Sequence, residues 1–248
     1  MRSDAPRPGC YASRVTQAQP RDEAPGDTGP GGVLDLLGLL AYGELVAFFQ
    51  LSEDAALAPS LADKAALGGM AVAEFGHFRL LEEHLSALGA QPEAAMLPFA
   101  PALDAFHART APSDWLEGLV KAYVGDGIAA DFYRAVAQLV DPQTRDLVLR
   151  VLGDTGHAEF VIARVRAAID ADPQIGGRLA LWARRLVGEA LAQAYRVVAD
   201  RPSLASLLSA GSTGEGSGPA AGLGDIGRMF ARITDAHAAR MTALGLAG

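Results

Sequence analysis

Two acid-x-x-His motifs, Glu74-Phe75-Gly76-His77 and Asp154-Thr155-Gly156-His157, lie eighty residues apart in the chain. Each motif lies within a stretch that is otherwise rich in Ala, Leu and Val. Residues three positions apart lie on the same face of an α-helix, about one turn from each other. Each motif is therefore predicted to present a carboxylate and an imidazole side by side, and this pairing constrains the fold more than any other feature.

Each motif is preceded by another acid in an apolar stretch with helical periodicity. Glu44 lies thirty residues before Glu74, and Asp126 lies twenty-eight residues before Asp154. Helical bundles build two-metal carboxylate sites in this way, with a carboxylate from each of two helices and an acid-x-x-His pair from each of the other two. The six predicted metal ligands are Glu44, Glu74, His77, Asp126, Asp154 and His157.

The balance of charge favours metal over salt bridges at this site. An unpaired carboxylate in an apolar interior costs several kcal/mol, so such groups are paired, protonated or bound to metal. Within one helical turn of the four acids, only Arg150 offers a positive charge. Two divalent cations would balance the four carboxylates and would take the two histidines as neutral ligands.

The ligand from the third helix has two candidates in the sequence. Asp131 follows Asp126 by five residues and also lies on an apolar helix face. The spacing favours Asp126, as do Gly125 and Gly127 on either side of it. Glycine inside a helix costs up to about 1 kcal/mol relative to alanine, which indicates a close approach or a local distortion at the site.

Two further residues lie one or two turns from the predicted ligands. His84 follows His77 by seven residues on the same helix face and is an alternate ligand. Tyr123 lies one turn before Asp126, where it is placed to hydrogen-bond a ligand. A packed histidine and a core tyrosine are the other interpretations of these two residues.

The apolar periodicity predicts an all-α fold without strands. The expected helices span residues 33–51, 60–88, 114–139, 143–169, 172–200 and 223–244. Capping signals at Ser60 with Asp63, Asp114 with Glu117, and Asp141-Pro142 mark three of the starts. Residues 90–112 form a long connection with a short helical turn near 103–107. One long crossover between two antiparallel helix pairs is the topology of the ferritin-like four-helix bundle.

The expected domain organisation has three parts. Residues 1–31 contain many Pro and polar residues without periodicity, so they are predicted to be a disordered tail. Residues 32–170 form the bundle. Residues 171–248 form two accessory helices, separated by a Gly/Ser-rich flexible loop at 209–222 and packed on the bundle.

Charge and cysteine content limit the partners and the compartment. The net charge is −8, and Lys64 and Lys121 are the two lysines, so nucleic acid or an anionic membrane would need a local basic patch. The single cysteine, Cys10, excludes an internal disulfide and a cysteine-based metal site. No signal peptide or membrane span is expected in the N-terminal segment, which favours the cytoplasm.

Around these residues the chain resembles the ferritin-like di-iron carboxylate proteins over about residues 33–169. Within that superfamily it is most similar to the bacterial tRNA hydroxylase family, in its hydroxylase-like branch of actinobacterial type. The similarity rests on Glu44, Glu74-x-x-His77, Tyr123-Val124-Gly125-Asp126-Gly127, Asp154-x-x-His157 and the extra C-terminal helices. That family hydroxylates the isopentenyl side chain of a methylthio-isopentenyl-adenosine in tRNA. The resemblance implies that the six ligands hold two iron ions, with manganese as the alternative.

The resemblance also implies O2, an electron donor and tRNA as partners, and a homodimer is a further expectation. Arg178, Arg185 and Arg196 fall on one side of the fifth helix, where they are candidate phosphate contacts. The leading hypothesis is a non-haem di-iron monooxygenase that hydroxylates an apolar C–H bond. The alternatives are an iron-binding, ferroxidase-like protein without an organic substrate, and a metal-free bundle that serves as an interaction module.

Overall fold

The computed structural model describes residues 30–153, 157–210 and 219–246. These residues are almost entirely helical and contain no strand, which confirms the predicted all-α class. The elements, in chain order, are α1 (Pro30–Ala56), α2 (Leu61–Ala87), α3 (Pro92–Met96), η1 (Leu97–Phe99), α4 (Ala100–Arg109), α5 (Trp115–Ala137), α6 (Pro142–Val151), α7 (His157–Ala171), α8 (Pro173–Asp200), α9 (Pro202–Ala210) and α10 (Pro219–Leu244).

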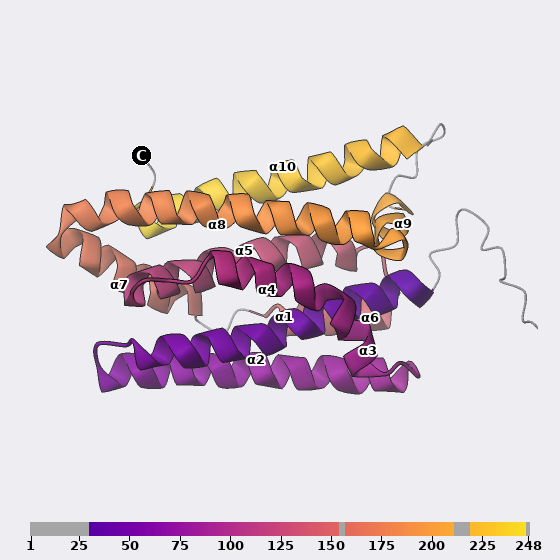
Figure 1. The fold of residues 1–248 in the computed structure, drawn as a ribbon, viewed down its shortest axis with the longest axis horizontal. Coiled ribbons are helices and arrows are strands. Elements are labelled where there is room, and N and C mark those ends of the chain that lie inside the picture. Colours follow the sequence, from indigo (N-terminus) through magenta and orange to yellow (C-terminus); the bar gives the residue numbers. More distant parts are fainter. Residues whose placement is uncertain (1–29, 154–156, 211–218, 247–248) are drawn as a thin grey trace, which may run out of the picture.

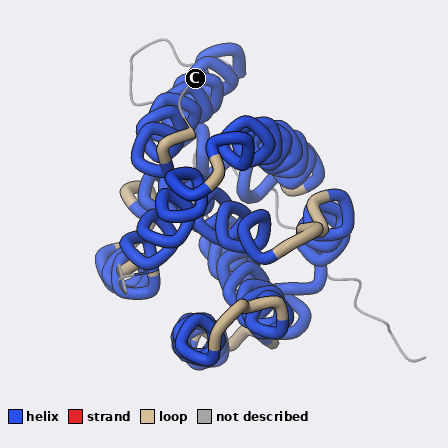
Figure 2. The backbone as a smooth tube through the Cα atoms, turned by 90° about the vertical axis from the view of Figure 1, so that its left-hand side faces the viewer, coloured by secondary structure: helices blue, strands red, loops and turns tan. Residues whose placement is uncertain are grey.

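The long helices lie side by side in layers. α1 and α2 pack along their whole length as an antiparallel hairpin at the bottom of Figure 1, and α8 and α10 lie at the top. Between these layers lie α5 and the crossover helix α4, both of which contact α8. Figure 2 shows the helix bundle turned by 90°, so that several of the helices are seen end-on. The crossover from α2 to α5 runs through α3, η1 and α4, as the ferritin-like topology requires.

The helix starts follow the local capping signals in the sequence. The Ser60 hydroxyl accepts a hydrogen bond from the backbone N–H of Asp63 at 3.1 Å. At the start of α5, the Asp114 carboxylate accepts one from the N–H of Glu117 at 2.9 Å. These caps satisfy N–H groups that have no partner within the helix, which fixes where α2 and α5 begin.

The apolar side chains form two buried clusters that both draw on the C-terminal helices. One cluster joins Leu36 and Leu40 of α1 to Leu204 of α9 and Phe230 of α10. The other joins α1, α2 and α5 to α7, α8 and the end of α10. α8, α9 and α10 therefore share the core of the bundle helices.

α1 is long and apolar enough to span a membrane by length and composition. Half of its most apolar window is buried inside the fold, and Leu36, Leu37 and Leu40 are at most 1% exposed. The apolar character of α1 is accounted for by core packing.

The prediction of one continuous fourth helix over residues 143–169 is wrong, because two helices, α6 and α7, occupy this part of the chain. α6 ends at Val151, Leu152 and Gly153 are not helical, and α7 begins at His157. The backbone N–H of Gly153 bonds back to the Arg150 carbonyl at 3.2 Å, which ends α6. Residues 153–156 read Gly-Asp-Thr-Gly, a run with low helix propensity.

Four further features differ from the sequence-based prediction. The helical turn expected near 103–107 is part of the longer α4, and α9 was not predicted at all. α1 begins at Pro30, two residues inside the predicted tail; the rest of that tail lies outside the described residues. The predicted loop 209–222 lies partly outside them, while its two ends belong to α9 and α10.

Candidate metal centre

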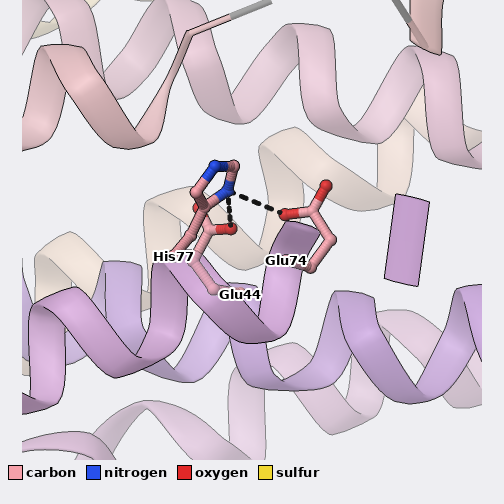
Figure 3. Close-up of side chains that lie close together, drawn as sticks. All are labelled: Glu44, Glu74 and His77. Carbon is pink, nitrogen blue, oxygen red and sulfur yellow. Dashed lines mark hydrogen bonds and ion pairs between the residues drawn. The ribbon is translucent and has the colours of Figure 1, made fainter. Parts of the chain in front are cut away.

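Glu44 of α1 and the pair Glu74 and His77 of α2 meet at the midpoints of their helices. One ligand atom from each of the three lies within 4.8 Å of the others. The His77 Nδ1 atom is 3.3 Å from Glu44 Oε2 and 3.5 Å from Glu74 Oε2, as Figure 3 shows. As the i,i+3 spacing predicts, the Glu74 and His77 side chains leave the same face of α2 and lie side by side.

His157 and Asp126 lie near this group, on α7 and α5. The Nδ1 atom of His157, the first residue of α7, lies 3.9 Å from Glu74 Oε1. Asp126 of α5 lines the same cavity as Glu44, Glu74 and both histidines. Asp154, the sixth predicted ligand, lies outside the described residues.

Burial and the contacts within the cluster shift the pKa values of Glu44, Glu74 and His77 in different directions. Burial raises the pKa of Glu44 well above its usual range, and the neighbouring Glu74 raises it further, although the hydrogen bond to His77 opposes this. Burial would also raise the pKa of Glu74, but its hydrogen bonds to His77 and Glu44 and the nearby charges of His77 and His157 lower it instead. The same hydrogen bonds to Glu44 and Glu74 raise the pKa of His77 to about 10.

Asp126 has a raised pKa for the same physical reason. Burial raises the pKa of its carboxyl group well above the usual range, and the negative charge of Glu74 adds to the effect. Clustered, desolvated carboxylates that cannot all ionise are typical of sites that bind cations. The converging donor set of Glu44, Glu74 and His77, two carboxylates and an imidazole, fits a metal ion.

A cavity of about 540 Å³ extends from this cluster through the interior. Its walls are mainly apolar side chains from α1, α4, α5, α8 and α10, including Leu40, Leu103, Phe132, Leu191 and Ile233. Tyr123 also lines it, and burial raises the pKa of the Tyr123 hydroxyl. The predicted ligands therefore face a space that could hold a small apolar molecule.

The two alternate ligands named from sequence lie elsewhere. Asp131 forms ion pairs with Arg240 of α10 and, at 3.6 Å, with Arg134. Neither Asp131 nor His84 is among the described residues that line the cavity. The geometry thus places Asp126, and not Asp131, beside the other predicted ligands.

Arg240 also explains one of the glycines beside Asp126. Its guanidinium donates to the Gly127 carbonyl at 2.7 Å, and a Cβ at position 127 would lie 2.2 Å from Arg240 Nε. Gly127 therefore permits a close approach of α10 to α5. Gly125 has no such neighbour within 4 Å, so the predicted close approach does not extend to it.

The candidate phosphate contacts on α8 are engaged within the chain. Arg178 pairs with Asp114 at 2.8 Å and with Glu117 at 2.6 Å. Arg185 donates to the Arg109 carbonyl at 2.6 Å, and Arg196 donates to the Gln193 side chain at 3.4 Å. Arg178 and Arg185 thereby link α8 to α5 and α4, whereas the contact of Arg196 lies within α8.

Several polar residues of the cavity wall escaped the sequence analysis, namely Gln50, Asp54, His107, Lys121 and Gln193. Each occurs in an apolar helix without a spacing motif. A signal existed for Lys121, because it is one of two lysines in the chain and lies five residues before Asp126.

Comparison with known proteins agrees with this architecture. A family model described as a ferritin-like domain of actinomycetes matches residues 30–211. The fold is also similar to a solved structure described as Protein 19 with aldehyde deformylating oxidase activity from Synechococcus. The TM-score is 0.56 at 17% identity, covering 85% of this chain and 93% of that one, so the likeness concerns the fold. No curated protein matches the sequence.

Proposed function

This chain belongs to the family of actinomycete ferritin-like domains, and from its site we propose that it is a non-haem di-iron protein that activates O2 to hydroxylate an apolar C–H bond. One observation carries the proposal: carboxylates and imidazoles from α1, α2, α5 and α7 gather at the wall of a largely apolar interior cavity. Ligands and substrate space are thus adjacent, as an oxidation of a bound organic molecule requires.

The residues divide between two metal positions. Glu44, Glu74 and His77 would hold one ion, because their ligand atoms already converge. Asp126, His157 and Asp154 would hold the second, and Glu74 lies close to both histidines. Iron bound there supplies redox chemistry with O2 that side chains alone cannot supply.

The side chains around the metal positions would bind the metal, exclude water and orient the substrate. A metal ion would replace the hydrogen bond between Glu44 and His77, and because metal ligands must be deprotonated, metal uptake would release protons. The apolar wall excludes water from the reacting atoms and orients an apolar substrate segment. Tyr123 lines the cavity with a hydroxyl that can donate to a ligand or a substrate.

The cavity also favours hydroxylation over iron oxidation alone, which needs the ligands but no organic binding space. The tRNA substrate implied by the sequence resemblance stays a prediction. Arg178 and Arg185 are engaged within the chain, and the net charge of −8 offers no general attraction for phosphates.

Metal stoichiometry of the protein purified from its native background tests the proposal. We expect two iron ions per chain in the wild type, a reduced iron content in Asp154→Ala, and an unchanged content in the matched control Asp131→Asn. Reduced, iron-loaded protein should then transfer an oxygen atom from 18O-labelled O2 to an apolar test substrate. Absence of bound metal, or equal metal content in all three proteins, would contradict the proposal. Rapid iron oxidation without oxygen transfer to any substrate would favour the ferroxidase-like alternative.

A further inference from the structure

Lys121 places a buried ammonium group at one end of the cavity. The side chain projects from α5, the residue is 5% exposed, and it lines the cavity wall. Its Nζ atom donates to Gln50 Oε1 of α1 at 3.1 Å and lies 5.8 Å from the centre of the Phe106 ring. A buried charge is costly unless it is paired and hydrogen-bonded, so the partners of this group need to be identified.

The partners within the chain are incomplete. An ammonium group has three N–H donors, and the described residues accept one of them, through Gln50. Asp54, 8% exposed, lines the same end of the cavity and acts on Lys121 through its charge, but no ion pair joins the two among the described residues. Burial lowers the pKa of Lys121 to about 8, so the amine is mostly charged at neutral pH.

His107 adds a buried polar atom without a partner to the cavity wall, within reach of the Lys121 charge. The Nδ1 atom of His107, on α4, is buried and has no hydrogen-bond partner among the described residues. Burial, together with the charge of Lys121, lowers the pKa of His107 to about 4, so its ring is neutral and one nitrogen can donate. This end of the cavity therefore holds more donors than the chain satisfies.

The unsatisfied donors lie at a defined distance from the predicted metal ligands. Lys121 precedes Asp126 by five residues in α5, and Gln50 follows Glu44 by six residues in α1. At a rise of about 1.5 Å per residue, the polar end is about 7–9 Å along the helix axes from the ligands. Beyond the ligands, the wall includes the apolar side chains of Leu39, Phe132 and Val197, and Gln193 also lines the cavity.

We propose that Lys121, with Gln50 and His107, binds the carboxylate of an aliphatic monocarboxylic acid whose chain extends through the cavity past Glu44 and Asp126. The carboxylate supplies the oxygen acceptors that the ammonium and the imidazole lack, and it forms the direct ion pair that Asp54 does not. The apolar chain fills the rest of the cavity. This inference rests on the proposed function only in naming its substrate class, because binding of the acid does not require iron.

A lysine with a purely structural role would link α5 to α1 through Gln50 and would be indifferent to what enters the cavity. The two roles differ in ligand binding, which makes them separable.

Calorimetric titration of the full-length protein with decanoate and with 1-decanol separates the two roles. We expect decanoate to bind the wild type at least tenfold more tightly than decanol, and Lys121→Met to remove that preference. The exposed Lys64 on α2 offers a matched control, and Lys64→Met should bind decanoate as the wild type does. Equal binding of decanoate and decanol to the wild type, or an unchanged preference in Lys121→Met, would overturn the proposal.

A second measurement covers the case in which Lys121→Met does not fold. Wild-type protein labelled with 13C at the lysine ε carbon should give two side-chain signals, because the chain has two lysines. Decanoate should shift the Lys121 signal and leave the Lys64 signal in place; shifts of neither would refute the subsite. Both titrations are run on iron-loaded and metal-free protein. If decanoate binds only to the iron-loaded protein, its carboxylate binds the metal and the Lys121 subsite is refuted. If decanoate binds but no oxygen is transferred to any substrate, the subsite stands and the proposed function is refuted.

Discussion

The Nδ1 atom of His77 lies 3.3 Å from Oε2 of Glu44, so an imidazole and a carboxylate join the first two helices at their midpoints. This contact comes from residues thirty-three positions apart and lies at the wall of the interior cavity. It brings the acid from α1 to the acid-x-x-His pair from α2, which is half of the predicted ligand set. The strength of metal binding should therefore depend on this contact.

Replacement of His77 by alanine is expected to weaken metal binding by more than about 10–100-fold, the usual loss when only an outer partner of a ligand is removed. The variant loses a nitrogen ligand and leaves Glu44 and Glu74 without their shared hydrogen-bond partner. Competition with a chromophoric chelator measures the affinity. His84→Ala is the control, because His84 lies on the same helix and does not line the cavity. Equal affinities in the two variants would argue against a metal site at His77.

Asp54 is expected to make stability depend on pH between about 4 and 6. Burial raises its pKa to about 6, while the charge of Lys121 opposes the shift and Glu53 adds to it. A carboxyl group with a raised pKa in the folded state contributes stability that is present below the unfolded pKa, about 3.9, and is lost as the pH rises through 6. The full difference corresponds to about 3 kcal/mol, which partial solvation reduces to about 1–2 kcal/mol.

Urea unfolding of the wild type and Asp54→Asn at pH 4 and pH 7 checks this expectation. From pH 4 to pH 7 the wild type should lose about 1–2 kcal/mol of unfolding free energy that the variant keeps, because asparagine does not titrate. Glu93→Gln, at an exposed position of α3 that does not line the cavity, should keep the wild-type profile. Parallel pH profiles for wild type and Asp54→Asn would show that Asp54 is not held in a desolvated position.

Local features of the fold could be predicted from the sequence, because they depend on neighbouring residues. The caps at Ser60 and Asp114 need one side chain and a backbone N–H three residues away. The pairing of Glu74 with His77 needs only the helical repeat. The break between α6 and α7 was hidden because the apolar periodicity continues across it, although Gly153 and Gly156 marked the place.

Long-range features could not be predicted, because they depend on which helices meet. The sequence does not show that Asp131 pairs with Arg240, because the two residues lie 109 positions apart in the chain. The polar end of the cavity escaped for the same reason: Lys121 and Gln50 are seventy-one residues apart, and neither belongs to a spacing motif. Sequence periodicity assigns a residue to one face of its helix, but it does not show which residues of other helices contact that face.

Replacement of Gly38 by alanine should destabilise the fold by about 1–3 kcal/mol, as overpacking of a buried position does. A Cβ at position 38 of α1 would lie 2.2 Å from the carbonyl oxygen of Ala95 in α3. The obstacle is backbone, so α3 must shift as a unit. Gly69→Ala in α2, where nothing lies within 4 Å, should instead stabilise by about 0.5–1 kcal/mol through helix propensity. Chemical unfolding measures both, and a stable Gly38→Ala protein would contradict the close contact between α1 and α3.

Replacement of Gln193 by leucine is expected to stabilise the fold and impair the reaction. Gln193 is 4% exposed on α8 and lines the cavity, and its Nε2 atom has no hydrogen-bond partner among the described residues. Its Oε1 atom accepts a hydrogen bond from Arg196 at 3.4 Å. An unsatisfied buried amide donor costs about 1–3 kcal/mol, so an apolar side chain of similar size should raise the unfolding free energy by about 1 kcal/mol.

The same substitution removes a hydrogen-bond donor from the cavity, so a stabilised protein with reduced oxygen transfer would show that the amide is retained for a ligand. Gln138→Leu, at the exposed end of α5, is the matched control and should change neither quantity appreciably. Unfolding free energy and product formation are measured on all three proteins. A Gln193→Leu protein that is less stable than the wild type would show that the donor already has a partner within the folded chain, and the stability argument for a ligand contact at this position would then fail.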